Sequence, residues 1–171
     1  MMQRANTLSA PRTSSRAPAQ KTLSSSSELG TVTEKQLKTL RALLDCVIPP
    51  DDFPGASEAG VADYVMRQLE SDLADKHDFY CSGLDAIENE TNARFQTSFA
   101  NLPPEQKIST LKLIELGDVS TSWPVSPKDF FTLLVNTTAE GYYSNPEQGG
   151  NRYAISWVMT GFDTSRNHEP I

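Results

Sequence analysis

The sequence predicts an all-α fold, an irregular bundle of five or six helices that follows an N-terminal tail. Apolar residues recur at three- and four-residue steps in several segments, which is typical of amphipathic helices. Capping residues start these segments, and proline or glycine ends them. Alternating β-branched runs and strand pairs joined by a hairpin turn are absent from the sequence, so a β-sheet is not expected.

The first helix is predicted to begin at Thr33, which forms a capping box with Gln36. Pro49 and Pro50 end this helix, because proline cannot continue it. They open a stiff loop that runs to Gly55. The apolar face of the helix comprises Leu37, Leu40, Leu44 and Val47.

Five further helical segments follow this loop. Pro104 suits a first helical turn, Gly117 a C-cap and Ser126 an N-cap. The segments are predicted across about 57–73, 75–95, 104–116, 126–142 and 153–159. Residues expected to face the core include Val61, Val65, Leu69, Phe79, Leu84, Ile87, Ile108, Leu111, Leu113 and Ile114.

Residues 1–30 are predicted to be a disordered tail, 31–163 a single helical domain and 164–171 a short C-terminal tail. The first thirty residues have few large hydrophobes and contain four consecutive serines. Their composition also resembles that of an organelle transit peptide. They carry four Lys or Arg against one Glu (+3), so the total of −7 leaves −10 for the remainder. An acidic domain is a poor match for phosphate backbones, so nucleic-acid binding is not expected.

Catalytic and metal-binding motifs are sparse. His77 and His168 form no HExxH pattern, and His77 is expected on a wet surface because Lys76 and Asp78 flank it. A GxSxG nucleophile elbow is also missing. Cys46 and Cys81 fit no zinc spacing and are expected to be buried free thiols, with a single disulfide as the alternative. The residues therefore favour a chain without a catalytic, cofactor or metal site of its own.

Two loops leave alternatives open. Asp51 and Asp52 could bind calcium, although the DxDxDG spacing is missing, so a solvated or capping role is favoured. Gly149 and Gly150 could cradle phosphate, but no lysine or preceding strand accompanies them, so a tight turn is favoured. The Tyr-rich stretch 140–153 suits either a partner interface or a plug at the end of the bundle.

Two blocks of sequence carry a resemblance to a known family. The first is LLDCVIPPDD at 43–52, continued by PGA at 54–56 and EAGV at 58–61. The second is TAEGYYSNP at 138–146, continued by GGN at 149–151, Trp157 and Gly161-Phe162. Arg94-Phe95, Phe99 and Leu102-Pro103 between the blocks also fit. Across about residues 37–162 the chain resembles the gluconate 2-dehydrogenase subunit 3 family.

The resemblance implies a non-catalytic small subunit that binds and stabilises, or matures, a large flavoprotein. That partner would be a FAD-dependent dehydrogenase of the glucose–methanol–choline type, which oxidises a sugar, glycoside or polyol. Electrons would leave through a cytochrome c or an iron–sulfur centre in another subunit. The small chain would hold no cofactor itself. A free-standing chaperone that binds the flavoprotein only transiently is the alternative, and an independent enzyme is the least favoured one.

The sequence also gives expectations for location and interface. A run of about 18 apolar residues is absent, so no membrane span is expected. The N-terminus lacks the twin-arginine signal often present in such subunits, which favours a cytoplasmic over a periplasmic complex. Residues predicted to form or buttress the partner-facing surface are Pro50, Asp51, Asp52, Phe53, Glu140, Tyr142, Tyr143, Asn145, Pro146, Gly149, Gly150, Asn151 and Arg152.

Overall fold

The computed structural model describes residues 32–162, so the predicted tails and His168 lie outside the described residues. Within that range the chain forms six α-helices and no strand, which confirms the all-α prediction. The helices are α1 (Glu34–Val47), α2 (Val61–Glu70), α3 (His77–Phe95), α4 (Pro104–Leu116), α5 (Pro127–Tyr143) and α6 (Ile155–Thr160). Short 3₁₀ turns are η1 (Ala74–Lys76), η2 (Phe99–Asn101), η3 (Pro146–Gln148) and η4 (Arg152–Ala154).

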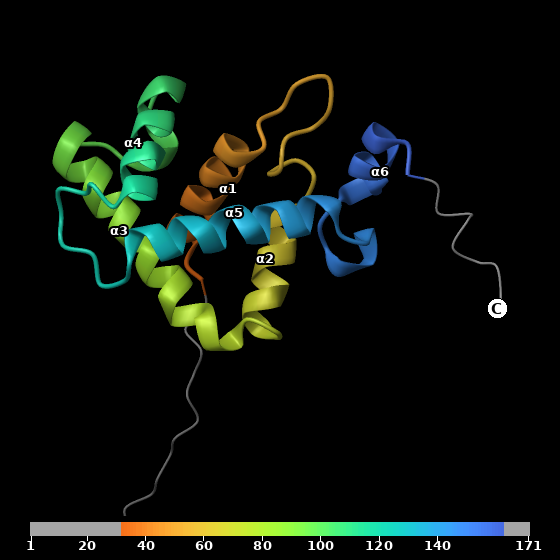
Figure 1. Ribbon diagram of the computed structural model, residues 1–171, viewed down its shortest axis with the longest axis horizontal. Helices are drawn as coiled ribbons and strands as arrows, with labels where there is room; N and C mark the ends of the chain where they lie inside the picture. The colour runs from red at the N-terminus through yellow and green to blue at the C-terminus, as the bar shows by residue number, and fades with distance from the viewer. Residues whose placement is uncertain (1–31, 163–171) are drawn as a thin grey trace, which may run out of the picture.

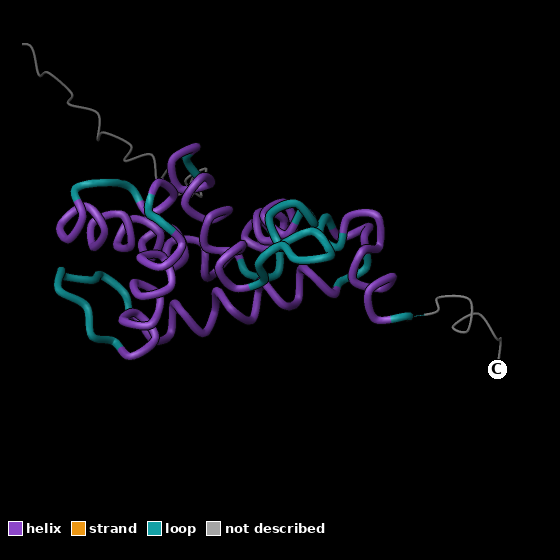
Figure 2. The backbone as a smooth tube through the Cα atoms, turned by 90° about the horizontal axis from the view of Figure 1, so that it is seen from above, coloured by secondary structure: helices purple, strands orange, loops and turns teal. Residues whose placement is uncertain are grey.

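Helix α5 is the axis of the molecule. It runs across the long dimension of the fold and contacts the other five helices, with α4 near its start and α6 beyond its end (Figures 1 and 2). Phe130 and Leu134 of α5 are fully buried. They join a core that also contains Leu40, Leu43, Leu44, Val65, Leu84, Ile87 and Ile114. Burial of large aliphatic and aromatic side chains on this scale is the main stabilising term for the bundle.

Local sequence signals explain several helix ends. The Thr33 side chain accepts from the Gln36 amide while Gln36 accepts from the Thr33 amide, which confirms the capping box. Ser126 caps α5 through the Asp129 amide. Gly117 ends α4 with a positive φ of 69°, where a residue without Cβ is favoured.

The second helix is shorter than predicted. It starts at Val61 rather than near residue 57, because Gly60 has a φ of 82° and residues 56–60 form turns. It ends at Glu70, and the Leu73 amide then donates to the Gln68 carbonyl in a separate turn. Left-handed backbone at Gly60 is incompatible with a right-handed helix running through it.

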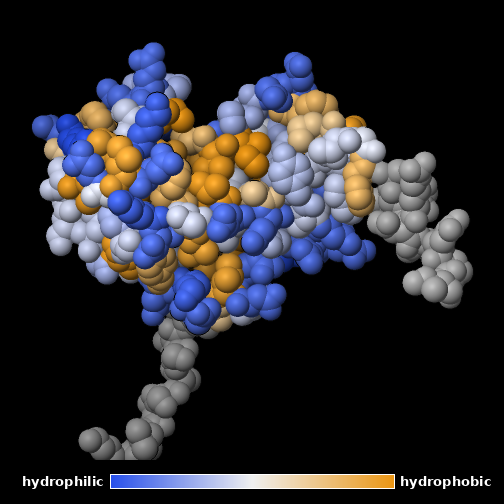
Figure 3. All heavy atoms as spheres, viewed as in Figure 1, coloured by the Kyte–Doolittle hydropathy of each residue, from blue (hydrophilic) through white to orange (hydrophobic). Residues whose placement is uncertain are grey.

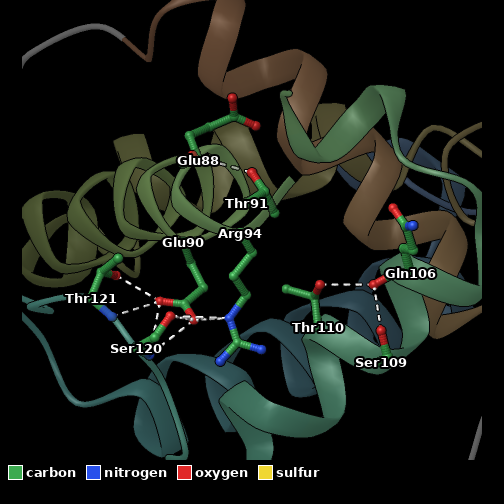
Figure 4. A network of polar contacts seen from close by, with 9 residues as sticks. All are labelled: Glu88, Glu90, Thr91, Arg94, Gln106, Ser109, Thr110, Ser120 and Thr121. Atoms are coloured by element: carbon green, nitrogen blue, oxygen red, sulfur yellow. Dashed lines mark hydrogen bonds and ion pairs between the residues drawn. The ribbon is translucent and has the colours of Figure 1, made fainter. Parts of the chain in front are cut away.

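A buried carboxylate ties the α4–α5 connection to α3 (Figure 4). Glu90 is fully buried and accepts hydrogen bonds from the backbone and hydroxyl groups of Ser120 and Thr121, at 2.7 to 3.1 Å. Arg94 donates to the same carboxylate at 2.6 Å. Burial alone would raise the pKa of Glu90, but these hydrogen bonds outweigh it and lower the pKa to about 2. Glu90 is therefore ionised at neutral pH and anchors the loop that leads into α5.

Candidate partner-binding surface

In residues 32–162, His77 and Cys81 lie together on α3, and Cys46 lies on α1. The prediction that His77 is on a wet surface is wrong: its exposed fraction is 5%. His77 lies on the same face of α3 as Tyr80 and Leu84, so helical position outweighed its charged neighbours. Its Nε2 lies 3.9 Å from the Sγ atom of Cys81, four residues along the helix.

This histidine–cysteine pair is poorly suited to nucleophilic chemistry. Burial, with Asp85 and Asp78 nearby, raises the pKa of the Cys81 thiol, so the thiol stays protonated at neutral pH. Burial also raises the pKa of Cys46. Both cysteines are free and half-buried. Among residues 32–162, no group of three or more His, Cys, Asp or Glu side chains is placed to hold a metal ion.

The loop between α1 and α2 is held in shape by its own backbone. The Ala56 amide donates to the Ile48 carbonyl at 2.9 Å, and the Ser57 amide donates to Asp45 Oδ1 at 2.8 Å. Asp51 forms a local turn, in which its side chain accepts from the Phe53 amide at 2.8 Å. Asp51 and Asp52 are exposed, which agrees with the solvated loop favoured over a calcium site, whereas the capping alternative is wrong because α2 begins after Gly60 without a side-chain cap.

The two sequence blocks that carry the family resemblance meet in space. The Tyr142 hydroxyl, at the end of α5, donates to the Pro54 carbonyl oxygen at 2.8 Å, across 88 residues of sequence. The Arg152 amide donates to the Ala59 carbonyl at 2.8 Å. Gly60 fits this contact because a Cβ there would lie 2.9 Å from the Gly149 carbonyl oxygen. The loops therefore form one continuous structure.

Two ionic and polar contacts close this junction. Arg152 Nη2 lies 2.8 Å from Asp63 Oδ2, and Arg67 donates to the Glu147 carbonyl at 3.0 Å. Both arginine contacts join α2 to the loop after α5. The Arg152–Asp63 pair is half exposed, so its contribution to stability is small, about 0–1 kcal/mol. Its main effect is to orient the loop.

The loop after α5 is organised by Asn151. This side chain is fully buried; its amide nitrogen donates to the Ser144 carbonyl at 2.8 Å, and its oxygen accepts from the Ser156 amide at 2.9 Å. Gly150 is packed so closely on the Gly141 carbonyl that no side chain fits there. Gly149 has a φ of 106°, which agrees with the tight turn favoured over a phosphate cradle.

The segment that follows has a strained backbone. Asn151, Tyr153 and Ala154 have φ values of 45°, 60° and 54°, three of the four positive-φ positions outside glycine in residues 32–162. A left-handed conformation costs roughly 1–2 kcal/mol for a residue with a Cβ, although asparagine tolerates it better. Such strain persists only where surrounding contacts impose it, and it concentrates at functional sites. The contacts of Asn151 and Arg152 impose it here.

Exposed apolar side chains gather at this end of the molecule. In residues 32–162, the exposed large hydrophobics are Tyr143, Tyr153, Val158, Phe162, Ile108 and Leu116. Tyr143 is the last residue of α5, and the next three flank or belong to α6. Tyr153 is the most exposed of them, at 88%. Trp157 packs on Phe162 with ring centroids 5.4 Å apart. We call Tyr143, Tyr153, Trp157, Val158 and Phe162 the aromatic end; α6 lies at the right in Figure 3.

A second apolar feature is a groove between α1, α4 and α5. Ile108, expected in the core, is 40% exposed and lines it, because α4 turns this side of its apolar face toward the open groove. Two adjoining hollows of about 290 and 480 Å³ share Ile108 and Cys46. Figure 3 shows a hollow between α4 and the α1–α2 loop with hydrophobic residues on its floor. The other lining residues include Val47, Pro49, Pro50, Leu111, Phe131 and Val135.

The predicted surface residues divide into two groups. Pro50, Asp51, Asp52, Glu140, Tyr143, Asn145 and Arg152 are exposed, and Phe53, Pro146 and Gly149 are half-buried. Tyr142, Gly150 and Asn151 are buried, so they buttress the surface instead of presenting side chains on it. Sequence reasoning selected Tyr143 and included Tyr153 in the stretch 140–153, but it did not select Val158 or Phe162 as site residues. An apolar residue on the outer side of a short amphipathic helix was the available signal for Val158.

One family model covers almost all of the described residues. A model of the family described as gluconate 2-dehydrogenase subunit 3 matches residues 34–163. The chain belongs to this family. The match covers α1 to α6, and with them the loop between α1 and α2, the loop after α5 and the aromatic end. No curated protein and no solved structure matches the chain. The family name indicates a subunit of a dehydrogenase complex.

Proposed function

We propose that this member of the gluconate 2-dehydrogenase subunit 3 family is a non-catalytic small subunit. It binds and stabilises a FAD-dependent dehydrogenase of the glucose–methanol–choline type, which oxidises a sugar, glycoside or polyol. The observation that carries the proposal is the junction of the two family blocks, because it presents exposed aromatic side chains on a hydrogen-bonded frame. FAD belongs to the large subunit in this proposal, and the small chain supplies binding surface.

The described residues support a binding role better than chemistry. The two cysteine thiols have raised pKa values, and the pair of Cys81 with His77 lies on the side of one helix. The aromatic end instead offers Tyr and Trp side chains, which are enriched where partners bind most strongly. A ligand or subunit that binds only the folded state of its partner stabilises that state. The small subunit would stabilise the flavoprotein in this way.

Co-expression tests the proposal. The full-length chain carries an affinity tag and is expressed with the glucose–methanol–choline-type flavoprotein encoded beside it. We expect a stoichiometric complex with flavin absorbance and sugar-dependent dye reduction, which persists through size-exclusion chromatography. A flavoprotein that is loaded with flavin and active without this chain, and never co-purifies with it, contradicts the proposal. A flavoprotein that needs the chain during expression but is later free of it favours the chaperone alternative.

Charge reversal locates the interface. Asp52 lies in the loop between α1 and α2, Glu147 lies in the loop after α5, and both are exposed. Among the described residues, Glu147 makes hydrogen bonds only through its backbone groups, and Asp52 makes none. The double variant Asp52→Lys/Glu147→Lys should reduce co-purification while the chain remains folded by circular dichroism. The double variant Glu105→Lys/Asp118→Lys, at exposed positions at the two ends of α4, reverses the same number of charges; it is the matched control and should leave the complex intact. Equal recovery of flavoprotein by all three proteins would place the interface elsewhere.

A further inference from the structure

We propose that Tyr153 is a pre-organised anchor, which inserts into an apolar hollow on the surface of the flavoprotein partner. This inference rests on the proposed function and deepens it, because it names the residue that dominates the binding. It follows from two independent observations about the same residue, its exposure and its backbone conformation. The exposure leaves the ring out of the core, and the backbone conformation is imposed by contacts of the neighbouring residues.

The exposed side chain of Tyr153 contributes little to the stability of the fold. With 88% of the residue exposed, its side chain adds almost nothing to the core, unlike Tyr142 and Tyr80, which are buried and hydrogen-bonded. Exposed aromatic rings that stand beside further apolar groups mark surfaces that a partner covers. Val158 and Phe162 are also exposed, on and just after α6, the helix that follows Tyr153 in the chain.

The backbone of Tyr153 is set by contacts of its neighbours. Asn151 is held on both sides of its amide group, and Arg152 is held by the Ala59 carbonyl and by Asp63. The Ala154 amide donates to the Asn151 carbonyl at 2.8 Å and closes the turn. The segment therefore presents the tyrosine from a left-handed position that a free chain seldom adopts.

A fixed backbone under an exposed ring reduces the entropy lost on binding. Rigid aromatic side chains on a pre-organised segment give large contact area at low cost, which is the property of binding hot spots. The occupant must offer an apolar hollow, because most of the surface of the exposed tyrosine ring is apolar. We assign this role to the flavoprotein because the family match makes the chain a dehydrogenase subunit and extends through η4 and α6.

The experiment measures the affinity of the full-length chain for the purified flavoprotein by surface plasmon resonance. Tyr153→Ala should weaken binding by about 30-fold or more, the range of a hot-spot residue. Tyr153→Phe should bind within about threefold of wild type, because the ring remains. Leu116→Ala is the matched control: Leu116 is 66% exposed on α4, away from α6, and its variant should bind like wild type.

The outcomes separate the inference from the function on which it rests. Tyr153→Ala should have an unchanged thermal unfolding midpoint, because the side chain is exposed, so weaker binding would reflect the lost contact. If wild type binds and Tyr153→Ala binds equally well, the anchor is refuted while the subunit role stands. If Leu116→Ala weakens binding as much as Tyr153→Ala, the anchor is also refuted. If wild type does not bind the flavoprotein, the proposed function itself fails.

Discussion

At the scale of single residues, buried charge is the feature that the sequence conceals best. Glu88 and Glu90 lie two positions apart on α3 and both are buried. Glu88 accepts from Thr39 at 2.8 Å and from the Phe99 amide at 3.1 Å. Nothing in the local pattern marks either glutamate as internal, because their partners come from distant loops and helices. Sequence analysis assigns such residues to solvent by default.

Replacement of Glu90 by glutamine tests this anchor. Because the pKa of Glu90 is lowered to about 2 in the folded state, its ionised form stabilises the fold above the unfolded pKa. Glu90→Gln should reduce the free energy of unfolding by about 2–3 kcal/mol at pH 7. The difference from wild type should shrink as the pH falls from about 4.5 to 2, where wild-type Glu90 becomes protonated.

Urea unfolding at pH 7, 5 and 3 provides this measurement. Glu105→Gln, at an exposed position in the first turn of α4, serves as the control and should change stability little. A constant difference between wild type and Glu90→Gln across this pH range would contradict the assigned ionisation.

At the scale of elements, helices with clear start and stop signals were predicted well. The Thr33 capping box, the Ser126 cap and the Gly117 C-cap all occur as expected, because each depends on residues within one turn. The predicted start of α2 was wrong, since the left-handed backbone of Gly60 keeps the helix from beginning before Val61. Ile108 was misassigned because apolar spacing cannot distinguish a core from an open groove.

The contact between α2 and α5 depends on Gly141. A Cβ at this position would lie 2.7 Å from Tyr64 Cδ1 and 2.9 Å from Val61 Cγ1. Gly141→Ala should therefore lower the free energy of unfolding by about 1–3 kcal/mol, although alanine has the better helix propensity by about 1 kcal/mol. Asn89→Ala, at an exposed site on α3, gains propensity without a clash and should be neutral or stabilising. Thermal unfolding of both variants shows whether the steric overlap at Gly141 or the helix propensity of alanine has the larger effect on stability.

At the scale of the whole molecule, contacts between the chain's two blocks determine the surface. The two blocks themselves were identified from the family resemblance. Their direct contact was not predicted, because nothing in a single sequence pairs Tyr142 with Pro54. Within the aromatic end, Tyr143 was among the predicted surface residues, whereas Val158 and Phe162 were missed. Exposure of Tyr153 follows from the turn that Asn151 organises, and this turn depends on hydrogen bonds to two separate parts of the chain.

Tyr142→Phe tests the coupling between the two blocks. Loss of the hydroxyl removes the hydrogen bond to the Pro54 carbonyl and should reduce the free energy of unfolding by about 1 kcal/mol. The loop between α1 and α2 should also open more often. Faster hydrogen exchange at the Ala56 and Val61 amides, with unchanged exchange inside α3, would show this local effect. Uniform acceleration throughout the helices would indicate global destabilisation instead.

The hydrogen bond between Arg152 and Ala59 also has a consequence for biosynthesis. The first loop leaves the ribosome long before the residues that complete the surface, and these include α6 near the end of the family domain. Contacts between such distant segments form only when the intervening chain is available. A nascent chain therefore cannot present the finished surface until translation has passed the last helix.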